Sequence, residues 1–599
     1  MDRRRWSWVC GIALATVALG CAAGAGAKAP GSGAEPATPG LNLPPAPKTL
    51  NLTRPALAGN AAPAPVLAIL QAELDRALGE LRAQDPPPYY LGYAVYEREV
   101  ASIEATDGAL LDSSGVVSRA LDVELRVGSP ELDNTHGDET PLYPGSVDLP
   151  IADADVPLRH GIWLATESAY QDAAKRLIEV RAAKEVEAEA SDDSPDFSRE
   201  PPVRYLEEPT RPTFDRGTWE ARVRELSGVF RRFPAIEHSY VKLRVSGGTR
   251  YLVSSEGTVL QTGDHHSFIA YGAELTAEDG TVVSRDEEAN AFTVDRLPSQ
   301  AELTQRVERL VGELMALRAA PPGEPYVGPA LLDGLAAAVM MHEVLGHRVE
   351  GHRLKSDWEG QTFAKKIGQR VMLPGFDVYD DPSLSRLNGT PLNGFFAFDD
   401  EGVRGQRTRL IEDGVFRGFL MSRTPIRGFP HSNGHGRKQP GFRVVSRQAN
   451  LVVEPEHVTT HDALKQALLD EVRRQKLPYG LRINRVMGGV TQTTADDPQA
   501  FQLDPVLVYR VFPDGHEELI RDVTLEGTPL SLLANIVGAA NDFAVFNGLC
   551  GAESGEIPVA AVSPSVLISR IEVARGSKVL ERPPLLSPPG AESTRSEAP

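Results

Sequence analysis

Apolar residues recur every three or four positions in several stretches of the chain, and this spacing predicts helices. Leucine repeats at this period over 65–83, behind Pro65, and over 299–319, where Ser299 and Glu302 form a capping box. The stretch 162–190 is also typical of a long helix. Residues 329–347 are apolar nearly throughout, which predicts a buried helix that ends in the polar sequence HEVLGH.

Apolar residues that alternate or cluster predict strands elsewhere, at 89–100, 120–128, 239–247, 250–263 and through most of 373–575. We therefore expect an α+β protein. An N-terminal α/β domain over 65–320 would carry an acidic insertion near 190–215. A strand-rich C-terminal domain would follow over 321–580, and the Pro-rich tail 581–599 is predicted to be disordered.

Composition and charge narrow the class of protein. Of the 599 residues 41% are hydrophobic and 24% are charged, which is a globular composition. Acidic residues outnumber basic ones by 82 to 62, so the formal net charge is -20. Because nucleic-acid binders need a stripe of basic residues and this chain has none, the sequence argues against nucleic acid as a partner.

The first residues have the pattern of an export signal. Three arginines at positions 3 to 5 precede an apolar run over 6–19 that is too short to span a bilayer, which needs roughly 20 apolar residues. The sequence VALGC resembles a bacterial lipobox, in which Cys21 would be lipidated after removal of 1–21. Ordinary cleavage after Ala27 and a twin-arginine signal are the alternatives. We expect an exported protein, periplasmic or anchored to the outer membrane through its lipid only, with 22–64 as an Ala/Gly/Pro-rich flexible tether.

Three histidines stand five residues apart at His342, His347 and His352, and Glu343 follows the first. A five-residue step turns a regular helix by about 140°, so two of these side chains share a site only if the backbone departs from a helix. A π-bulge would do this, and so would a helix that ends at Gly346. Two imidazoles and a carboxylate suit a zinc hydrolase, while surface histidines at a helix end are the alternative.

The cysteine count adds one observation. The chain has three cysteines, and only Cys550 would remain unmodified in a processed lipoprotein, so it could form no internal disulfide. A lone thiol in an oxidising compartment is unusual. The simpler alternative is a buried cysteine in the core.

The segment HEVLGHRVEG resembles the His-Glu-x-x-x-His signature of the TldD/PmbA metallopeptidase family, in particular its metal-binding TldD branch. Similar sequence continues in the same order through 399–423, 432–437, 483–494 and 534–568. The resemblance implies that Cys550, in LCGAESG, is a third ligand beside His342 and His347. It also implies one Zn²⁺ per chain and Glu343 as the general base.

The same resemblance implies hydrolysis of peptide bonds in unfolded or extended peptides, from a cleft inside a homodimer or a heterodimer with a family member. Arg437, in SNGHGR, is a candidate for binding substrate, with a structural loop arginine as the alternative. His352 is a weaker candidate ligand, because its spacing differs from that of three-histidine metalloproteases.

Glu350 could orient a ligand histidine or lie on a solvated face. Two rival functions stay open. One is a non-catalytic peptide-binding or assembly subunit of a TldD/PmbA-like complex. The other is an envelope scaffold whose metal is only structural.

Overall fold

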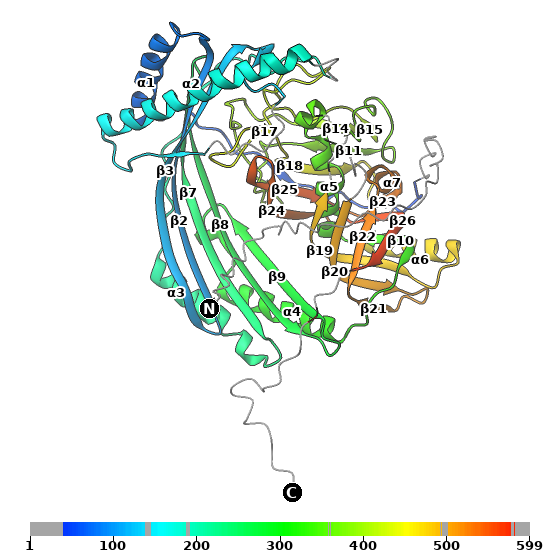
Figure 1. Cartoon of the computed structure of the whole chain (residues 1–599). Coiled ribbons are helices and arrows are strands. Elements are labelled where there is room, and N and C mark those ends of the chain that lie inside the picture. The colour runs from blue at the N-terminus through cyan, green and yellow to red at the C-terminus, as the bar shows by residue number, and fades with distance from the viewer. Residues whose placement is uncertain are drawn as a thin grey trace.

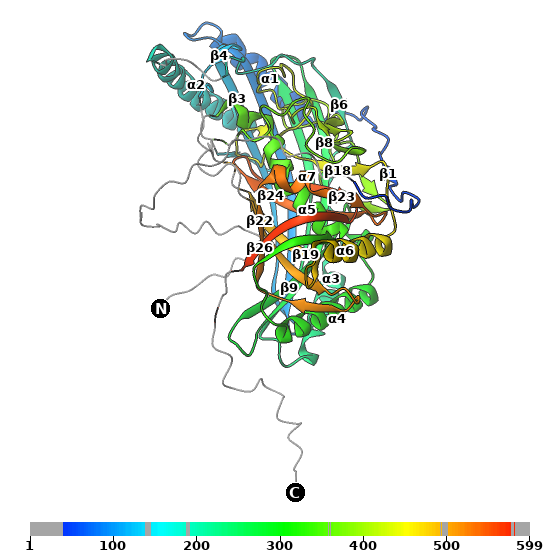
Figure 2. The same ribbon diagram turned by 90° about the vertical axis from the view of Figure 1, so that its right-hand side faces the viewer.

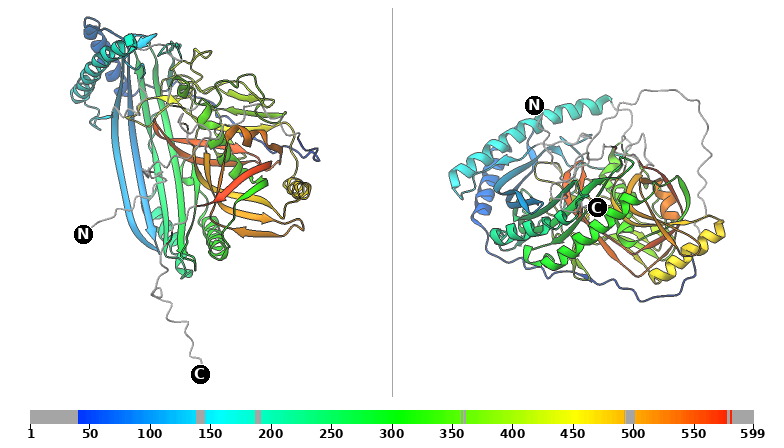
Figure 3. Two further views of the ribbon diagram at one scale, coloured as in Figure 1. Left: turned by 45° about the vertical axis from the view of Figure 1, so that its right-hand side comes forward. Right: turned by 90° about the horizontal axis from the view of Figure 1, so that it is seen from below.

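The structure is a computed structural model that describes residues 40–137, 145–186, 192–356, 359, 361–491, 493, 501–576 and 580. Strands outnumber helices in it, and both are present in the two halves of the chain (Figure 1). The predicted α+β class is confirmed. The C-terminal part, coloured green to red, lies along one side of the long N-terminal strands (Figure 3).

One large sheet dominates the N-terminal part, with strand order β4-β3-β2-β7-β8-β6, β5 paired to β3 and β9 paired to β8. Its pairs are antiparallel except for that of β6 with β8. Alternate residues of its strands face opposite sides. Ile103, Leu243 and Tyr271 pack beneath two of the helices, whereas Tyr96 and Leu252 pack against the C-terminal part. The strands are β2 (Pro88–Thr106), β3 (Ala109–Ser129), β4 (Leu132–Asp133), β5 (Val147–Asp148), β6 (Arg204–Leu206), β7 (His238–Ser254), β8 (Val259–Thr276) and β9 (Val282–Ala291).

The helices on this sheet follow the predicted periodicity. Helix α1 (Pro65–Leu81) and α2 (Asp155–Val186) pack at one end, and α3 (Arg216–Ser227) and α4 (Gln300–Ala319) pack at the other. Ser299 caps α4 and accepts a hydrogen bond from the Glu302 amide, as the capping box predicts. The helix predictions at 65–83, 162–190 and 299–319 are confirmed within a few residues at each end, apart from the earlier start of α2.

Two large sheets carry most strands of the C-terminal part, and β12 (Arg386–Leu387), β13 (Thr390–Pro391), β16 (Gly436–Arg437) and β17 (Val445–Ser446) lie in two small ones. The first large sheet has the order β10-β19-β20-β22-β26-β23, and β26 also pairs with β10, which closes the path into a ring. The second has the order β15-β14-β11-β18-β25-β24, so β24 is an edge strand. The strands near the site are β10 (Tyr326–Leu332), β18 (Asn450–Pro455), β19 (Gly480–Thr491), β24 (Ala544–Ala552), β25 (Gly555–Ser563) and β26 (Val566–Arg575). The others are β11 (Phe376–Asp380), β14 (Thr408–Glu412), β15 (Val415–Phe416), β20 (Phe501–Val511), β21 (Glu517–Ile520), β22 (Val523–Gly527) and β23 (Ile536–Ala539).

Helix α5 (Gly334–Val344) packs against strands of both sheets, namely β19, β24 and β25 (Figure 2). Helix α6 (His461–Gln475) packs on β10 and β26, and α7 (Pro529–Ala534) contacts β26. Because α5 is enclosed on several sides, nearly all of its side chains are buried. The end of α5 therefore delivers polar groups into the interior between the two sheets.

The predicted helix over 329–347 is wrong at both ends. Residues 329–332 belong to β10, and α5 begins at Gly334 and ends at Val344. A run that is apolar on every side has no period, so it does not distinguish a buried strand from a buried helix. Asp333 separates the two elements and binds the side chains of Arg482 and Asn484.

The prediction of a flexible tether is wrong for 40–64, which pack along the folded chain. The Leu41 amide donates to the Val537 carbonyl at 3.0 Å, and β1 (Leu52–Thr53) pairs with β12 (Arg386–Leu387). Further along, the Ala61 amide donates to the Leu206 carbonyl at 2.9 Å. Isolated leucines dock one at a time here, so the segment has no periodicity that would reveal its packing. Residues 22–39, Cys21, the signal 1–21 and the tail 581–599 lie outside the described residues.

The described part of the predicted acidic insertion packs against the C-terminal part. Phe197 lies between the guanidinium groups of Arg126 and Arg423, at 3.9 and 3.8 Å from its ring centroid. Lys355 donates to the Pro195 carbonyl at 2.6 Å. Among the described residues, no helix combines the length and the hydropathy needed to cross a membrane.

Candidate metal centre

A helix end between His342 and His347 explains how two histidines five residues apart can share one site. His342 and Glu343 occupy the last turn of α5, which ends at Val344, and His347 lies in the following 3₁₀ helix η3 (Gly346–Val349). The change from α to 3₁₀ geometry alters the rotation between the two histidines. Of the two backbone arrangements that the sequence left open, the structure therefore has the helix end, two residues earlier than Gly346, and no π-bulge.

Gly346 is required by a close approach. Its φ angle is not among the positive ones, so unusual backbone angles do not explain the residue. A Cβ atom at this position would lie 1.8 Å from Oε1 of Gln448, and Gln448 Nε2 donates to the His342 carbonyl at 3.4 Å. The missing side chain lets Gln448 pack directly against the turn that separates the two histidines.

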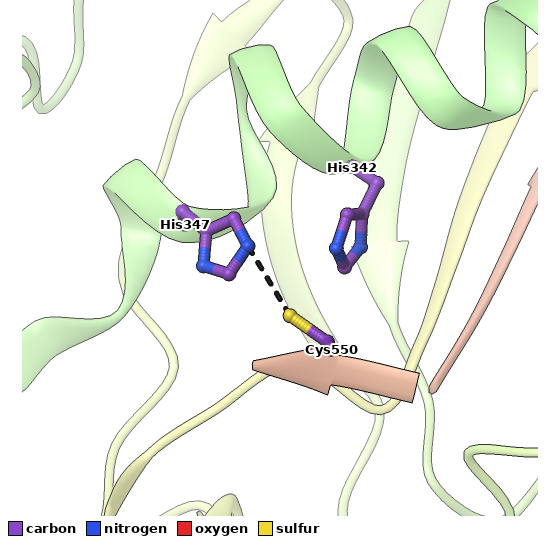
Figure 4. A group of neighbouring side chains, drawn as sticks. All are labelled: His342, His347 and Cys550. Atoms are coloured by element: carbon purple, nitrogen blue, oxygen red, sulfur yellow. Dashed lines mark hydrogen bonds between the residues drawn. The ribbon is translucent and has the colours of Figure 1, made fainter. Parts of the chain in front are cut away.

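Strand β24 brings Cys550 to the two histidines (Figure 4). One ligand atom from each of His342, His347 and Cys550 lies within 4.8 Å of the others, and all three residues are buried. The Cys550 Sγ atom is 3.2 Å from His347 Nε2, and the two imidazole centroids are 4.9 Å apart. The structure thus brings together the three residues that the sequence predicts as ligands.

Charge interactions dominate in this group. Burial alone would lower the pKa of His347, but the charges of Cys550 and Glu350 raise that pKa well above its ordinary value. Burial alone would raise the pKa of the Cys550 thiol, but His347 and His342 lower it well below its ordinary value. These opposite shifts favour a thiolate beside an imidazolium when no metal is bound. A thiolate is also the form of cysteine that binds metals, and the His347 proton is the one that a metal would displace.

The donor set fits a zinc ion. Nδ1 of His342 is buried and has no hydrogen-bond partner within the described residues, and an unsatisfied buried polar atom costs about 1–3 kcal/mol. Two imidazoles and one thiolate are nitrogen and sulfur donors of the kind zinc prefers, whereas Mg²⁺ and Ca²⁺ take oxygen ligands. Three protein ligands leave one position open, as catalytic zinc sites require.

Glu350 holds His347 in place. Its Oε2 accepts hydrogen bonds from His347 Nδ1 at 3.3 Å and from Arg353 Nη2 at 2.8 Å. Burial would raise the pKa of the Glu350 carboxyl, but His347 and Arg353 outweigh burial and lower the pKa to about 2. Glu350 is 1% exposed, so it orients the histidine and does not lie on a solvated face.

His352 is not part of the group. Its Nε2 forms a hydrogen bond with Glu553, and the cluster of potential ligand atoms contains His342, His347 and Cys550 without it. The third histidine of the regular series therefore belongs to the surrounding hydrogen-bond network.

Glu343 is buried beside the three residues and is positioned by β19. Burial raises the pKa of its carboxyl, against the opposing effect of His342 and His347. Thr491 Oγ1 donates to the Glu343 carbonyl at 2.6 Å, and a Cβ atom on Gly489 would lie 2.9 Å from Glu343 Cγ. Sequence reasoning missed Gly489 and Thr491, although paired glycines inside a strand are a sign of close packing.

Arg437 makes the contacts of a structural arginine, which was the alternative to a role in substrate binding. It is buried, and its guanidinium donates to the carbonyls of Gln448 at 2.6 Å and Pro558 at 2.8 Å. Burial lowers its pKa to about 10. Its terminal nitrogens thus bind the protein's own backbone.

Comparisons with known proteins agree with this geometry. Residues 325–575 match the model of the PmbA/TldA metallopeptidase C-terminal domain, and this segment carries His342, Glu343, His347 and Cys550. Over this segment, the chain is similar to the C-terminal domain of the TldD/PmbA family. The predicted family resemblance is therefore confirmed.

Relatives with metalloprotease names match a little under half of this chain. A metalloprotease of Archaeoglobus fulgidus is 31% identical over 268 residues, which cover 44% of this chain and 56% of the relative. A metalloprotease TldD homolog of Haemophilus influenzae is 26% identical over 258 residues, covering 43% and 49%. The chain thus spans about half the length of these relatives.

The fold extends further than the sequence similarity. The crystal structure of TldE from Thermococcus kodakarensis aligns with a TM-score of 0.56 at 14% identity, covering 85% of this chain and 100% of that one. At this identity the match shows the fold alone. It extends into the N-terminal part, which lies outside the match to the family model.

Proposed function

We propose that this protein is a zinc-dependent metallopeptidase that hydrolyses peptide bonds in unfolded or extended peptides. The convergence of His342, His347 and Cys550 beside Glu343 carries the proposal. The family match and the metalloprotease names of its relatives support the reaction class. The preference for unfolded chains rests on the family resemblance.

In this proposal each residue has one role. Zinc, when bound, would lower the pKa of its water ligand to roughly 7 and would polarise the scissile carbonyl. His342, His347 and Cys550 would hold the ion. Glu343 would accept the proton of the attacking water on its carboxylate and pass it to the leaving amine nitrogen.

The intact set of residues favours an enzyme over the two rivals. A non-catalytic peptide-binding or assembly subunit has no need of a buried His-His-Cys group with an adjacent carboxylate. A purely structural zinc site has four protein ligands, and the described residues supply three nitrogen or sulfur ligands here.

Zinc analysis and a cleavage assay test the proposal directly. We expect the purified protein to contain about one zinc per chain and to cleave a permanently unfolded protein, with chelation abolishing cleavage and added zinc restoring it. Binding of such chains without cleavage under any metal condition would favour the binding subunit. Stoichiometric zinc with neither binding nor cleavage would favour the scaffold.

We also propose that the protein is exported and anchored to the cell envelope by a lipid on Cys21, on the basis of the lipobox-like sequence VALGC. Cys21→Ala should release the protein from the membrane fraction. The zinc content should not change, because Cys21 is not one of the three residues of the candidate metal centre. Unchanged fractionation of the variant would exclude lipidation at this residue.

For the assembly we propose a dimer, either of this chain or with another family member. The resemblance to the TldD/PmbA family motivates this, and the structural likeness to TldE shows that the two proteins share one fold. Sedimentation of the purified chain as a monomer, alone and mixed with a family member from the same cell, would contradict it.

A further inference from the structure

Arg447 is among the largest side chains of the protein that are fully buried, and it lies next to the metal centre. Its Nη2 donates to the Cys550 carbonyl at 2.7 Å. Its Nη1 donates to Ser554 Oγ at 2.8 Å and to the Gly555 carbonyl at 3.2 Å. The guanidinium therefore binds the hairpin of β24 and β25 both at the residue that carries the thiolate and at the turn.

The other side of the same guanidinium faces the histidines. Nε of Arg447 lies 3.3 Å from Glu350 Oε1 in an ion pair without a hydrogen bond, and both groups are fully buried. The second oxygen of Glu350 accepts the hydrogen bond from His347 Nδ1. A continuous path therefore runs from His347 through Glu350 and Arg447 to Cys550, which lies 203 residues further along the chain.

This path matters because β24 is an edge strand. It pairs with β25 on one side, and the described part of the chain places no strand of this sheet on its other side. The ladder of β24 and β25 fixes the register of Cys550 with Ile557, but it does not fix the distance of the hairpin from η3. Arg447 spans that gap. Its own amide donates to the His435 carbonyl at 2.9 Å, and the nearby Asn450 amide donates to Asp380 at 2.9 Å.

A planar guanidinium with several fixed donors suits this position better than an ammonium group, which acts as a point charge. Burying a charge far from water is costly unless it is paired and hydrogen-bonded. A residue that only filled space between the hairpin and η3 could be apolar. Here both terminal nitrogens bind the hairpin that carries the ligand Cys550. Nε faces Glu350, which holds the ligand His347.

We propose that Arg447 is a positioning residue that sets the distance between Cys550 and the two histidines of the metal centre. The inference rests on the proposed function only in taking this group as the metal site. It predicts that loss of the guanidinium weakens zinc binding because the thiolate is displaced, with the three ligands themselves unchanged.

Arg447→Met is compared with Arg437→Met, a matched control. Arg437 is also buried and also binds backbone carbonyls, one of them in β25, but it interacts with Cys550 through charge alone and has no hydrogen bond to Cys550 or Glu350 among the described residues. We expect Arg447→Met to lower zinc affinity by about 10- to 100-fold, the usual cost of losing an outer-shell partner, and Arg437→Met to change it little. Arg447→Lys should restore only part of the loss, because an ammonium group cannot reproduce the fork.

Spectroscopy separates displacement of the thiolate from general destabilisation. In the Co²⁺-substituted full-length protein, the thiolate-to-cobalt absorption band should weaken in Arg447→Met and persist in Arg437→Met, even if both variants melt at lower temperature than wild type. Equal zinc affinities and equal bands in the two variants would overturn the role of Arg447.

Failure of the proposed function gives a different result. If the wild-type protein binds neither Zn²⁺ nor Co²⁺, the metal assignment is wrong. The positioning role is then decided in the metal-free protein by the alkylation rate of Cys550, followed on its own peptide by mass spectrometry. Arg447→Met should raise this rate above that of Arg437→Met if the guanidinium holds the hairpin, and equal rates would refute it.

Discussion

Substitution of Cys550 by alanine should release the zinc and abolish peptide hydrolysis. The change removes a ligand and leaves two imidazoles, and His347 loses its thiolate partner at 3.2 Å. Loss of an outer-shell partner costs about 10- to 100-fold in metal affinity, so we expect loss of a ligand to cost more than about 100-fold. Elemental analysis after dialysis and a chelator competition measure the affinity, and cleavage of an unfolded protein measures the activity.

His352→Ala is the matched control for this prediction. It removes a histidine of the same series, close in the chain and partly buried, which the structure places outside the ligand group. This variant should keep stoichiometric zinc. Stoichiometric zinc in Cys550→Ala would remove Cys550 from the site, and zinc loss in His352→Ala would mean that the ligand set is assigned wrongly.

The histidine pair of the centre could be predicted from its spacing, and Cys550 from the family resemblance. The spacing of His342 and His347 demanded a break in the helix, and the lone cysteine matched a ligand position of the family. The supporting residues could not be found in this way. Arg447 and Gln448 act through contacts with residues about a hundred positions away, and an arginine or a glutamine in a loop has no local pattern that reveals such a role.

The fold, too, could be predicted only in part from the sequence. Helices with a clear period, such as α1 and α4, lie close to their predicted positions because periodicity reports one buried face. The run 329–347 is buried on all sides, so its pattern could not separate β10 from α5. Segment 40–64 packs by single leucines and backbone hydrogen bonds, which leave no trace in composition.

The position at which α5 ends decides the geometry of the metal ligands. A helix continuing to residue 347 would turn His347 away from His342 by about 140°. The real end at Val344 and the 3₁₀ turn after it direct both imidazoles to Cys550. Gly346 makes this possible by admitting Gln448 at the turn. The ligand geometry thus depends on the glycine as much as on the histidines.

Glu343→Gln should separate catalysis from metal binding. The amide is similar in size to the carboxylate but cannot accept a proton, and loss of a general base typically lowers the rate by ~10² to 10⁴-fold. Zinc should remain, because Glu343 is outside the ligand group. The fold should tolerate the change, since burial raises the pKa of Glu343 and so penalises its charged form in the folded protein. Measurement of kcat/KM on an unfolded substrate, zinc content and melting temperature tests all three expectations.

The comparison with His342→Ala makes the Glu343 result specific. His342→Ala should lose zinc and activity together, whereas Glu343→Gln should lose activity with its zinc in place. A Glu343→Gln variant that cleaves as fast as wild type would show that another group accepts the proton. A variant that loses its zinc would instead make Glu343 a ligand. In that case the site would have four protein ligands and no open position for water, which is the geometry of a structural zinc site and not of a peptidase.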